Sequence, residues 1–477
     1  VAILTAEGVT VLDAMEQPVV KEHHHIDWEI SAAEKGGYPH FMFKEIMEEP
    51  EAIRRTVGPR LHEGKIVFEG LHLTPEELRG MERITIIACG SSYHVGVIGK
   101  YNLEKMTRIP VEVTLASEFR YCSPIVNERT LAIIISQSGE TLDTMAALRE
   151  AKSLGARILS IVNVVGSSIA RESDDVLYTW AGPEIAVATT KAYSTQMAVL
   201  DLLAVYLAAQ RKTISAEEAG RLTAAIAALP AQVEQILSSR EQIQYYASQY
   251  FNHNSVFFIG RNLDYALGME GSLKLKEISY IHSEAYASGE LKHGTISLIE
   301  PGTLVIALGT YGPLFDKAMS NVIEVKARGA SVLALTTENR REDLSSRVDG
   351  ILTIPETELP LLPLLPALLQ WNIKRTDGEP CDSFSVQFLC GKTTKELLEQ
   401  ATEFRATEKG RVVFTGIVDD FELRLGKEGA IAELTGRGMA ARLMDMQTPA
   451  AEYVSAQLED ILNAYVRPCG ITKIEAD

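Results

Sequence analysis

The chain has 477 residues, 46% of them hydrophobic, and a formal net charge of -18 at pH 7. This length is enough for several globular domains with separate cores. The acidic balance disfavours nucleic acid or an anionic membrane as the main partner, although local N–H groups and helix dipoles can still bind a small phosphorylated ligand. Neither a long apolar run nor a basic leader followed by apolar residues is present. We therefore expect a cytoplasmic chain without a membrane span or signal peptide.

The five cysteines include no C-x-x-C pair. We expect reduced thiols and neither a zinc site nor a disulfide framework, and no motif calls for a metal or a cofactor. The run of three histidines at 23–25 is compatible with a metal site or a tag remnant, but its polar continuation favours a solvated linker.

Residues 1–79 open with "VAILTAEGVTVLD", two short apolar stretches around a Glu-Gly turn. They predict a β-hairpin, which cannot hold a core by itself. We expect the hairpin to be the end of something larger, followed by a polar linker with helices.

An internal repeat organises the middle of the chain. "TLAIIISQSGETLDT" from Thr130 aligns with "TLVIALGTYGPLFDK" from Thr303, and each is followed by a helical pattern, a Gly-Ala pair and a second apolar stretch. Upstream, "ITIIACGSSYHVG" from Ile84 matches "SVFFIGRNLDYALG" from Ser255. Because the two pairs of segments are separated by nearly the same length of chain, a whole domain is duplicated.

Alternating strands and helices predict an α/β fold with two tandem, doubly wound parallel sheets. We place the first domain at residues 80–215 and the second at 245–370. Residues 216–244 have helical periodicity and few strand formers, so they predict a helical linker.

The two copies differ at the loop after the repeated strand. The first copy carries hydroxyl and amide side chains at Ser136, Gln137, Ser138 and Thr141. The second copy has Gly309, Thr310, Tyr311 and Leu314 at these places. A loop needed only for the fold could be the same in both copies, so the asymmetry favours a ligand in the first. The alternative is a helix cap, which Ser and Thr commonly form.

Two further loops of the first domain carry small and hydroxyl residues. Gly90, Ser91 and Ser92 follow the neighbouring strand, and "EIAVATTKAYSTQ" from Glu184 opens another helix. None of these loops matches a dinucleotide or nucleoside triphosphate motif. Their chemistry suits a single phosphate held by hydroxyls and backbone N–H groups, without an obligatory metal.

These motifs, together with "MEGSLKLKEISYIHSEAY" and "GELKHG", resemble the sugar-isomerase (SIS) domains of the glutamine–fructose-6-phosphate aminotransferase family over residues 25–365. The resemblance implies an enzyme that makes glucosamine 6-phosphate from fructose 6-phosphate with ammonia from glutamine, commonly as a homodimer. It also implies a phosphate site and a sugar site, formed respectively by Ser92, Ser136, Gln137, Ser138 and Thr141, and by Val187 and Thr189.

The second domain carries a cluster of titratable residues at 271–294, which we expect to be mostly helical. Aldose–ketose isomerisation moves a proton between C1 and C2, a task for a carboxylate, which we assign to Glu277. Sugar-ring opening suits a histidine, and His293 of the "ELKHG" motif takes that role. Lys274, one turn before Glu277, would orient it or bind sugar hydroxyls. The alternative is a solvated helix face, the interpretation we favour for His282.

Three other features complete the expectations. Cys89 lies beside a serine loop, but we interpret it as a small buried residue because no base is evident near it. Proteins of the family begin with a glutaminase domain that carries a catalytic cysteine. Residues 1–79 would correspond only to the end of that domain. A fragment of a longer protein, a partner or free ammonia would explain the nitrogen source.

The family's terminal lysine, which can form an imine with the sugar, has no match after "LPLLPLLPALLQ". Residues 371–477 read as an unassigned α+β segment, in which Lys392 and Lys473 have no evident connection to the site. Its expected elements are strand Ser383–Leu389, helix Thr394–Phe404, strands Arg411–Val418 and Phe421–Leu425, and helix Pro449–Val466. Regulation, oligomerisation or replacement of the missing tail would each explain it.

Three function classes stay open. The first is the synthase or its isomerase half, and the second is another SIS-domain enzyme, such as a sugar-phosphate isomerase or an amino-sugar-phosphate deaminase or deglycase. The third is a non-catalytic sugar-phosphate sensor, in which Glu277 and His293 would be surplus.

Overall fold

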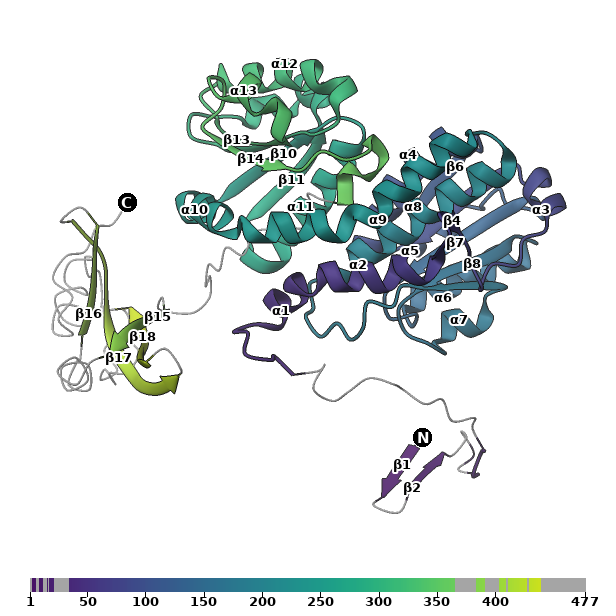
Figure 1. The fold of residues 1–477 in the computed structure, drawn as a ribbon, viewed down its shortest axis with the longest axis horizontal. Coiled ribbons are helices and arrows are strands. Elements are labelled where there is room, and N and C mark those ends of the chain that lie inside the picture. The colour runs from purple at the N-terminus through teal and green to yellow at the C-terminus, as the bar shows by residue number, and fades with distance from the viewer. Residues whose placement is uncertain are drawn as a thin grey trace, which may run out of the picture. The chain divides into compact units, whose positions relative to one another are not determined.

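The structure is a computed structural model that describes residues 2–5, 8–11, 15, 17–20, 34–364, 383–390, 403–408, 411–426 and 429–438. The chain divides into two compact units, residues 1–373 and 374–477 (Figure 1). The histidine run at 23–25 lies outside the described residues.

The first domain is built on a five-stranded parallel sheet in the order β6-β5-β7-β8-β9. Its strands are β5 (Arg83–Ala88), β6 (Val111–Leu115), β7 (Thr130–Ser136), β8 (Arg157–Val162) and β9 (Asp175–Tyr178). Alternate residues of β7 enter different cores, because Ile133 packs in one cluster and Ile134 in another. The sheet is therefore covered on both faces, as its almost continuous apolar strands predict.

Helices flank this sheet (Figure 1). They are α4 (Gly90–Thr107), α5 (Ala116–Phe119), α6 (Leu142–Ser153), α7 (Ser168–Glu172) and α8 (Lys191–Arg211). In the described part of the chain, α8 is the one helix long and apolar enough to cross a membrane, and 89% of its apolar window is buried within the protein. That burial is typical of a core helix.

The second domain repeats this topology with the order β11-β10-β12-β13-β14. Its strands are β10 (Ser255–Gly260), β11 (His282–Ala287), β12 (Leu304–Gly309), β13 (Ser331–Thr337) and β14 (Gly350–Ile354). Its helices are α11 (Leu263–Ser279), α12 (Phe315–Lys326) and α13 (Arg341–Leu344). The matching strand orders confirm the duplication and the α/β class.

The helix after the first strand of each domain ends in the same way. α4 stops at Thr107 before the left-handed Arg108, and α11 stops at Ser279 before the left-handed Tyr280. In both, the last hydroxyl donates to the carbonyl four residues earlier and accepts the N–H two residues later. Thr107 and Ser279 are therefore equivalent positions, and the two helices can be aligned from these ends.

This helix end corrects one expectation. The segment 271–294 is helical only to Ser279, and the edge strand β11 and the 3-10 helix η3 (Ser288–His293) follow it. The left-handed backbone of Tyr280, which no helix interior tolerates, ends α11 and turns the chain back into the sheet.

The connecting segments are helical, as expected for residues 216–244. α9 (Ala216–Ser238) and α10 (Arg240–Tyr250) precede the second domain. The hairpin of β1 (Ala2–Thr5) and β2 (Gly8–Val11) is antiparallel, as expected. Between the hairpin and the first sheet lie α1 (Phe41–Met47), α2 (Glu49–Val57), β3 (Leu61–His62), β4 (Lys65–Ile66) and α3 (Pro75–Gly80).

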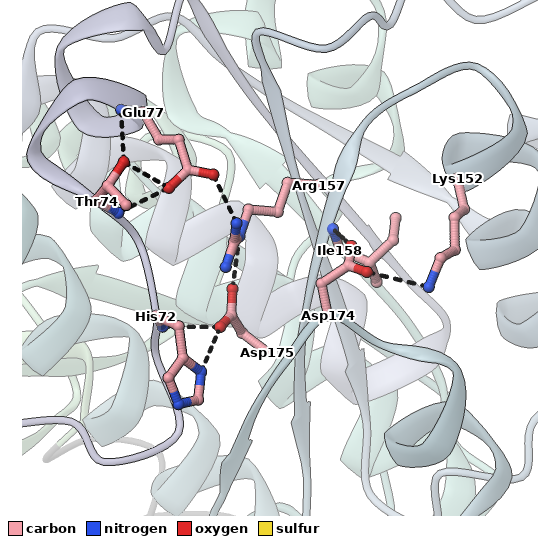
Figure 2. Close-up of polar contacts among 8 residues, drawn as sticks. All are labelled: His72, Thr74, Glu77, Lys152, Arg157, Ile158, Asp174 and Asp175. Carbon is pink, nitrogen blue, oxygen red and sulfur yellow. Dashed lines mark hydrogen bonds and ion pairs between the residues drawn. The ribbon is translucent and has the colours of Figure 1, made fainter.

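A polar network fixes α3 and the segment before it to the start of β8 and β9 (Figure 2). The buried Asp175 carboxylate accepts from Arg157 Nε at 2.8 Å and from the backbone N–H of His72 at 2.8 Å. Arg157 also reaches Glu77, at 2.7 Å, and Glu77 forms a capping box with Thr74. The network lies at the edge where these strands begin, so it belongs to the scaffold.

In the second unit, the described strands form an antiparallel sheet in the order β15-β18-β17-β16. They are β15 (Ser383–Cys390), β16 (Glu403–Glu408), β17 (Arg411–Gly426) and β18 (Gly429–Gly438). Three expectations for this segment can be checked in part.

Strand Ser383–Leu389 is confirmed by β15, whereas the two strands expected at 411–418 and 421–425 are one continuous strand. A register shift against β18 between Val418 and Asp420 lies at the gap between the two expected strands. The expected helix Thr394–Phe404 is wrong at its end, since Glu403 and Phe404 begin β16, and its other residues lie outside the described ones. The helix expected at 449–466 also lies outside them.

Candidate active site

A crevice of about 230 Å³ opens at the carboxyl ends of the neighbouring strands β5 and β7. We call it the first crevice. It is lined by Cys89, Ser91, Ser92, Ile135, Ser136, Gln137, Ser138, Thr141, Thr144, Val187, Thr189, Lys274 and Glu277. Three loops of the first domain and one helix of the second therefore meet at one cavity, at the edge where parallel α/β sheets bind ligands.

The loop after β7 is organised by its own hydroxyls. Ser136 Oγ accepts from the N–H of Gly139 at 3.1 Å and lies 3.2 Å from Thr141 Oγ1. Gly139 has a φ of +67°, and a Cβ there would lie 2.1 Å from Ser167 Oγ, so only glycine fits this turn. Thr141 is the N-cap residue of α6, but its side chain makes no cap hydrogen bond. The alternative interpretation, in which these hydroxyls serve as a helix cap, therefore does not apply to Thr141.

The loop after β5 leads directly into α4. Ser92 is 9% exposed, and its hydroxyl donates to Gln196 Oε1 at 3.0 Å. The N-termini of both α4 and α6 lie at this crevice, and their N–H groups and dipoles favour a bound anion. Gly90 starts α4 with a φ of +54°, but it does not line the cavity.

The third loop, which begins at Glu184 and leads into α8, is held in place by two carboxylates. Glu184 accepts from two backbone N–H groups at the start of α8, at 2.9 and 3.1 Å. Glu45 of α1 accepts from the N–H groups of residues 185 and 186, at 2.6 and 3.1 Å. Burial raises the pKa of Glu184, although the hydrogen bonds oppose that rise. This loop also places Val187 and Thr189 in the lining of the crevice, and Val187 is fully exposed.

Helix α2 ties the same region to the start of α8. Lys191, which is 2% exposed, pairs with Glu48 at 2.6 Å, and Ser194 donates to Glu49 at 2.6 Å. Burial raises the pKa of Glu49 to about 8, and the hydrogen bond from Ser194 limits that rise. The helices before the first domain therefore belong to the scaffold of the crevice.

The second domain contributes a chain of charged side chains along α11. Glu277 is partly exposed and lines the crevice, and its carboxylate is hydrogen-bonded to Lys274. Lys274 is almost fully buried and lies 3.5 Å from the buried Glu270, which in turn lies 2.7 Å from His94 Nδ1. Because His94 is on α4, these contacts connect the two domains directly beside the proposed base.

His293 is not brought to this crevice. It lies exposed at the end of η3 and is absent from the lining residues. Its role in ring opening stays a prediction. His282 is also exposed, but it lies on strand β11 and not on a helix face, with its Nδ1 3.3 Å from Ser255 Oγ.

Sequence reasoning missed several residues of the site. Cys89 is half-buried and lines the crevice, 3.8 Å from Thr144 Oγ1, rather than being a fully buried filler. Glu270 could have been found from its four-residue spacing to Lys274 on a helix. His94 could not, because its partner lies 176 residues away.

The SIS domain family matches residues 77–206 and 249–364, which together make more than half of the chain. The chain therefore belongs to the family of SIS-domain proteins. It is 36% identical to the solved C-terminal domain of glucosamine-fructose-6-phosphate aminotransferase from Francisella tularensis, with a TM-score of 0.68, and the match covers 71% of this chain and 96% of that one.

Curated relatives of this chain share one enzyme name. Glutamine–fructose-6-phosphate aminotransferase [isomerizing] from Clostridium acetobutylicum is 52% identical over 367 residues, which cover 77% of this chain and 60% of the relative. The protein of that name from Caldanaerobacter subterraneus subsp. tengcongensis is also 52% identical, over 76% of this chain and 60% of the relative. The chain thus spans about 60% of the length of these relatives.

Proposed function

We propose that the chain is the isomerase portion of a glutamine–fructose-6-phosphate aminotransferase and converts fructose 6-phosphate and ammonia to glucosamine 6-phosphate and water. The observation that carries the proposal is the joint lining of one cavity by the hydroxyl loops of the first domain and by Lys274 and Glu277 of the second. This arrangement offers an anion site and a proton-transfer group to one small ligand.

In this proposal the phosphate lies against the loops after β5 and β7. Ser92, Ser136, Gln137, Ser138 and Thr141 supply side-chain contacts, assisted by Ser91 and by Gly90 at the start of α4. The helix N-termini supply the positive potential, which suits an otherwise acidic protein. Val187 and Thr189 approach the sugar. No group of three or more metal-ligating side chains occurs among the described residues, and the proposed binding needs none.

Glu277 is the proposed acid–base group. Its carboxylate takes a proton from C1 of the open-chain fructose 6-phosphate and returns it to C2, so that the carboxylate is regenerated. A second proton passes from the C1 hydroxyl to the C2 oxygen, which completes the change from ketose to aldose. Lys274 supplies the positive partner that keeps this carboxylate in position, and Glu270 holds Lys274 from the other side. His293 is the proposed acid for ring opening, although it lies outside the crevice of one chain.

We further propose that glutamine supplies the ammonia in the full-length enzyme, that residues 1–79 are the end of its glutaminase-like domain plus a linker, and that the protein is a cytoplasmic homodimer. These proposals rest on the family similarity. Light scattering coupled to size-exclusion chromatography tests the dimer, and a monomeric mass would contradict it.

The activity is tested by incubating the chain with fructose 6-phosphate, with and without ammonium. The proposal expects glucosamine 6-phosphate in the first case and glucose 6-phosphate in the second. Ser136→Ala should weaken fructose 6-phosphate binding in calorimetry by about tenfold, in line with the loss of one hydrogen bond to a charged group. Binding without either product would instead favour a non-catalytic sensor.

A further inference from the structure

The duplication creates a second crevice that mirrors the first. This second crevice, of about 240 Å³, is lined by Tyr101, Asn102, Glu104, Lys105, Arg108, Asn262, Leu263, Tyr311 and Pro360. When α4 and α11 are aligned from their equivalent ends, Asn102 and Lys105 of α4 occupy the positions of Lys274 and Glu277 of α11. Each crevice thus combines strand-end loops of one domain with the second half of the paired helix from the other.

The loop after β12, next to the second crevice, already holds an anion. Asp264 accepts from the backbone N–H groups of Thr310 at 3.1 Å and of Tyr311 at 3.0 Å, and the Thr310 hydroxyl donates to its other oxygen. The carboxylate is provided from the first turn of α11 and is only 3% exposed. These donors lie where the first domain has Gln137 and Ser138, since both loops follow the central strand of their sheet.

The first domain has no such carboxylate. The same helix alignment places Ser92 at the position of Asp264, and its hydroxyl donates to Gln196 on α8 instead of filling the loop after β7. The helix residue beside each loop therefore differs: it is the hydroxyl of Ser92 in the first copy and the carboxylate of Asp264 in the second.

We propose that Asp264 is an internal substitute for phosphate, which closes a latent anion site in the second domain and restricts sugar-phosphate binding to the first crevice. The inference rests on the proposed phosphate site of the first domain. A carboxylate that accepts three hydrogen bonds satisfies the donors that a phosphate would need, and its charge repels a second anion.

The surroundings of Asp264 support this role. Burial raises the pKa of Asp264 to about 6, against the opposing hydrogen bonds from Thr310 and Tyr311, so the carboxylate is charged at neutral pH. Lys105 and Arg108 line the second crevice, and neither side chain has an ion-pair partner within the described residues. Removal of the carboxylate would free the N–H groups of Thr310 and Tyr311. Tyr311 lines the second crevice together with Lys105, Arg108 and the carboxylate of Glu104.

The test uses Asp264→Ser, which introduces the residue of the first domain, in the full chain. Calorimetric titration with inorganic phosphate should change from one bound equivalent per chain in wild type to two in this variant. Asp264→Asn is the matched control, because its amide oxygen can still accept from the two N–H groups and it should remain at one equivalent.

An unchanged number of sites in folded Asp264→Ser overturns the inference. If the wild-type chain binds no phosphate, the proposed function fails. In that case one site in Asp264→Ser would still support this inference, and no site would overturn it. Should the variant be too unstable to titrate, its thermal midpoint is followed as phosphate is raised. A steeper rise than in wild type supports the latent site, and an equal rise overturns it.

Discussion

At the scale of single residues, the site depends on the charged side chains along α11. Lys274 contacts Glu277 on the crevice side and lies 3.5 Å from Glu270 on the buried side. A buried cation between two carboxylates is stable only when both partners remain. The spacing of these residues on a helix was visible in the sequence, whereas the contribution of His94 was not, because a contact across 176 residues leaves no local pattern.

Lys274→Met should separate binding from catalysis. Loss of the ammonium leaves Glu270 and Glu277 without their common partner, so the rate of isomerisation should fall by about 100-fold or more. The affinity for inorganic phosphate should stay within about threefold, since the loops that bind it are in the other domain. Calorimetry and a glucose 6-phosphate assay give the two values. An equal loss in both would mean that Lys274 holds the ligand rather than the base.

At the scale of elements, the shape of the loop after β7 decides whether its hydroxyls converge. The sequence predicted a loop at the end of this buried strand, and its Ser, Gln and Thr side chains favoured a phosphate, with a helix cap as the alternative. It could not predict that β11 follows α11, since the left-handed Tyr280 that ends the helix has no glycine signal. Nor could it show that Glu45, on a helix before the domain, holds the loop at 185 and 186.

Gly139→Ala should distort this loop. The new Cβ would lie 2.1 Å from Ser167 Oγ at a φ of +67°, so the turn must open. We expect a loss of about 1 to 3 kcal/mol in unfolding free energy and at least tenfold weaker phosphate binding. Gly220→Ala, in the interior of α9 with open space around it, is the control and should be neutral or slightly stabilising. Wild-type phosphate affinity in Gly139→Ala would contradict the proposed role of this turn.

At the scale of the whole molecule, the polar network of Figure 2 holds the segment before the first domain at the edge opposite the crevice. Burial raises the pKa of Asp175, but hydrogen bonds from Arg157 and His72 outweigh it, and the net pKa lies below the ordinary value. A carboxyl with a lowered pKa in the folded state adds stability that is present above its unfolded pKa, about 4, and is lost as the pH falls through the folded pKa.

Asp175→Asn should therefore destabilise the chain at pH 7 by about 2 kcal/mol, because the guanidinium of Arg157 loses the buried one of its two charged partners and keeps only Glu77. The difference from wild type should shrink as the pH falls below about 4. Chemical unfolding followed by circular dichroism at several pH values measures it. A difference independent of pH would show that the carboxylate charge contributes nothing.

The duplicated α/β architecture could be predicted for the whole SIS portion, because strand and helix patterns recur in the same order in both domains, with matching glycines. The second unit could be predicted only in part. Its long strand β17 contains Asp419 and Asp420 at its register shift. A sequence pattern cannot distinguish such a shift from a turn. The internal carboxylate of the second domain also escaped detection, since it becomes visible only when both loops are superposed through the structure.

The proposed mechanism requires Glu277 to move a proton on a sugar whose phosphate is bound in the first crevice. The most direct test is the rate of glucose 6-phosphate formation from fructose 6-phosphate by Glu277→Gln, which keeps the size of the side chain. We expect a rate lower by roughly 100-fold to 10,000-fold, with phosphate affinity unchanged. A variant that isomerises at the wild-type rate would contradict the proposed role of Glu277.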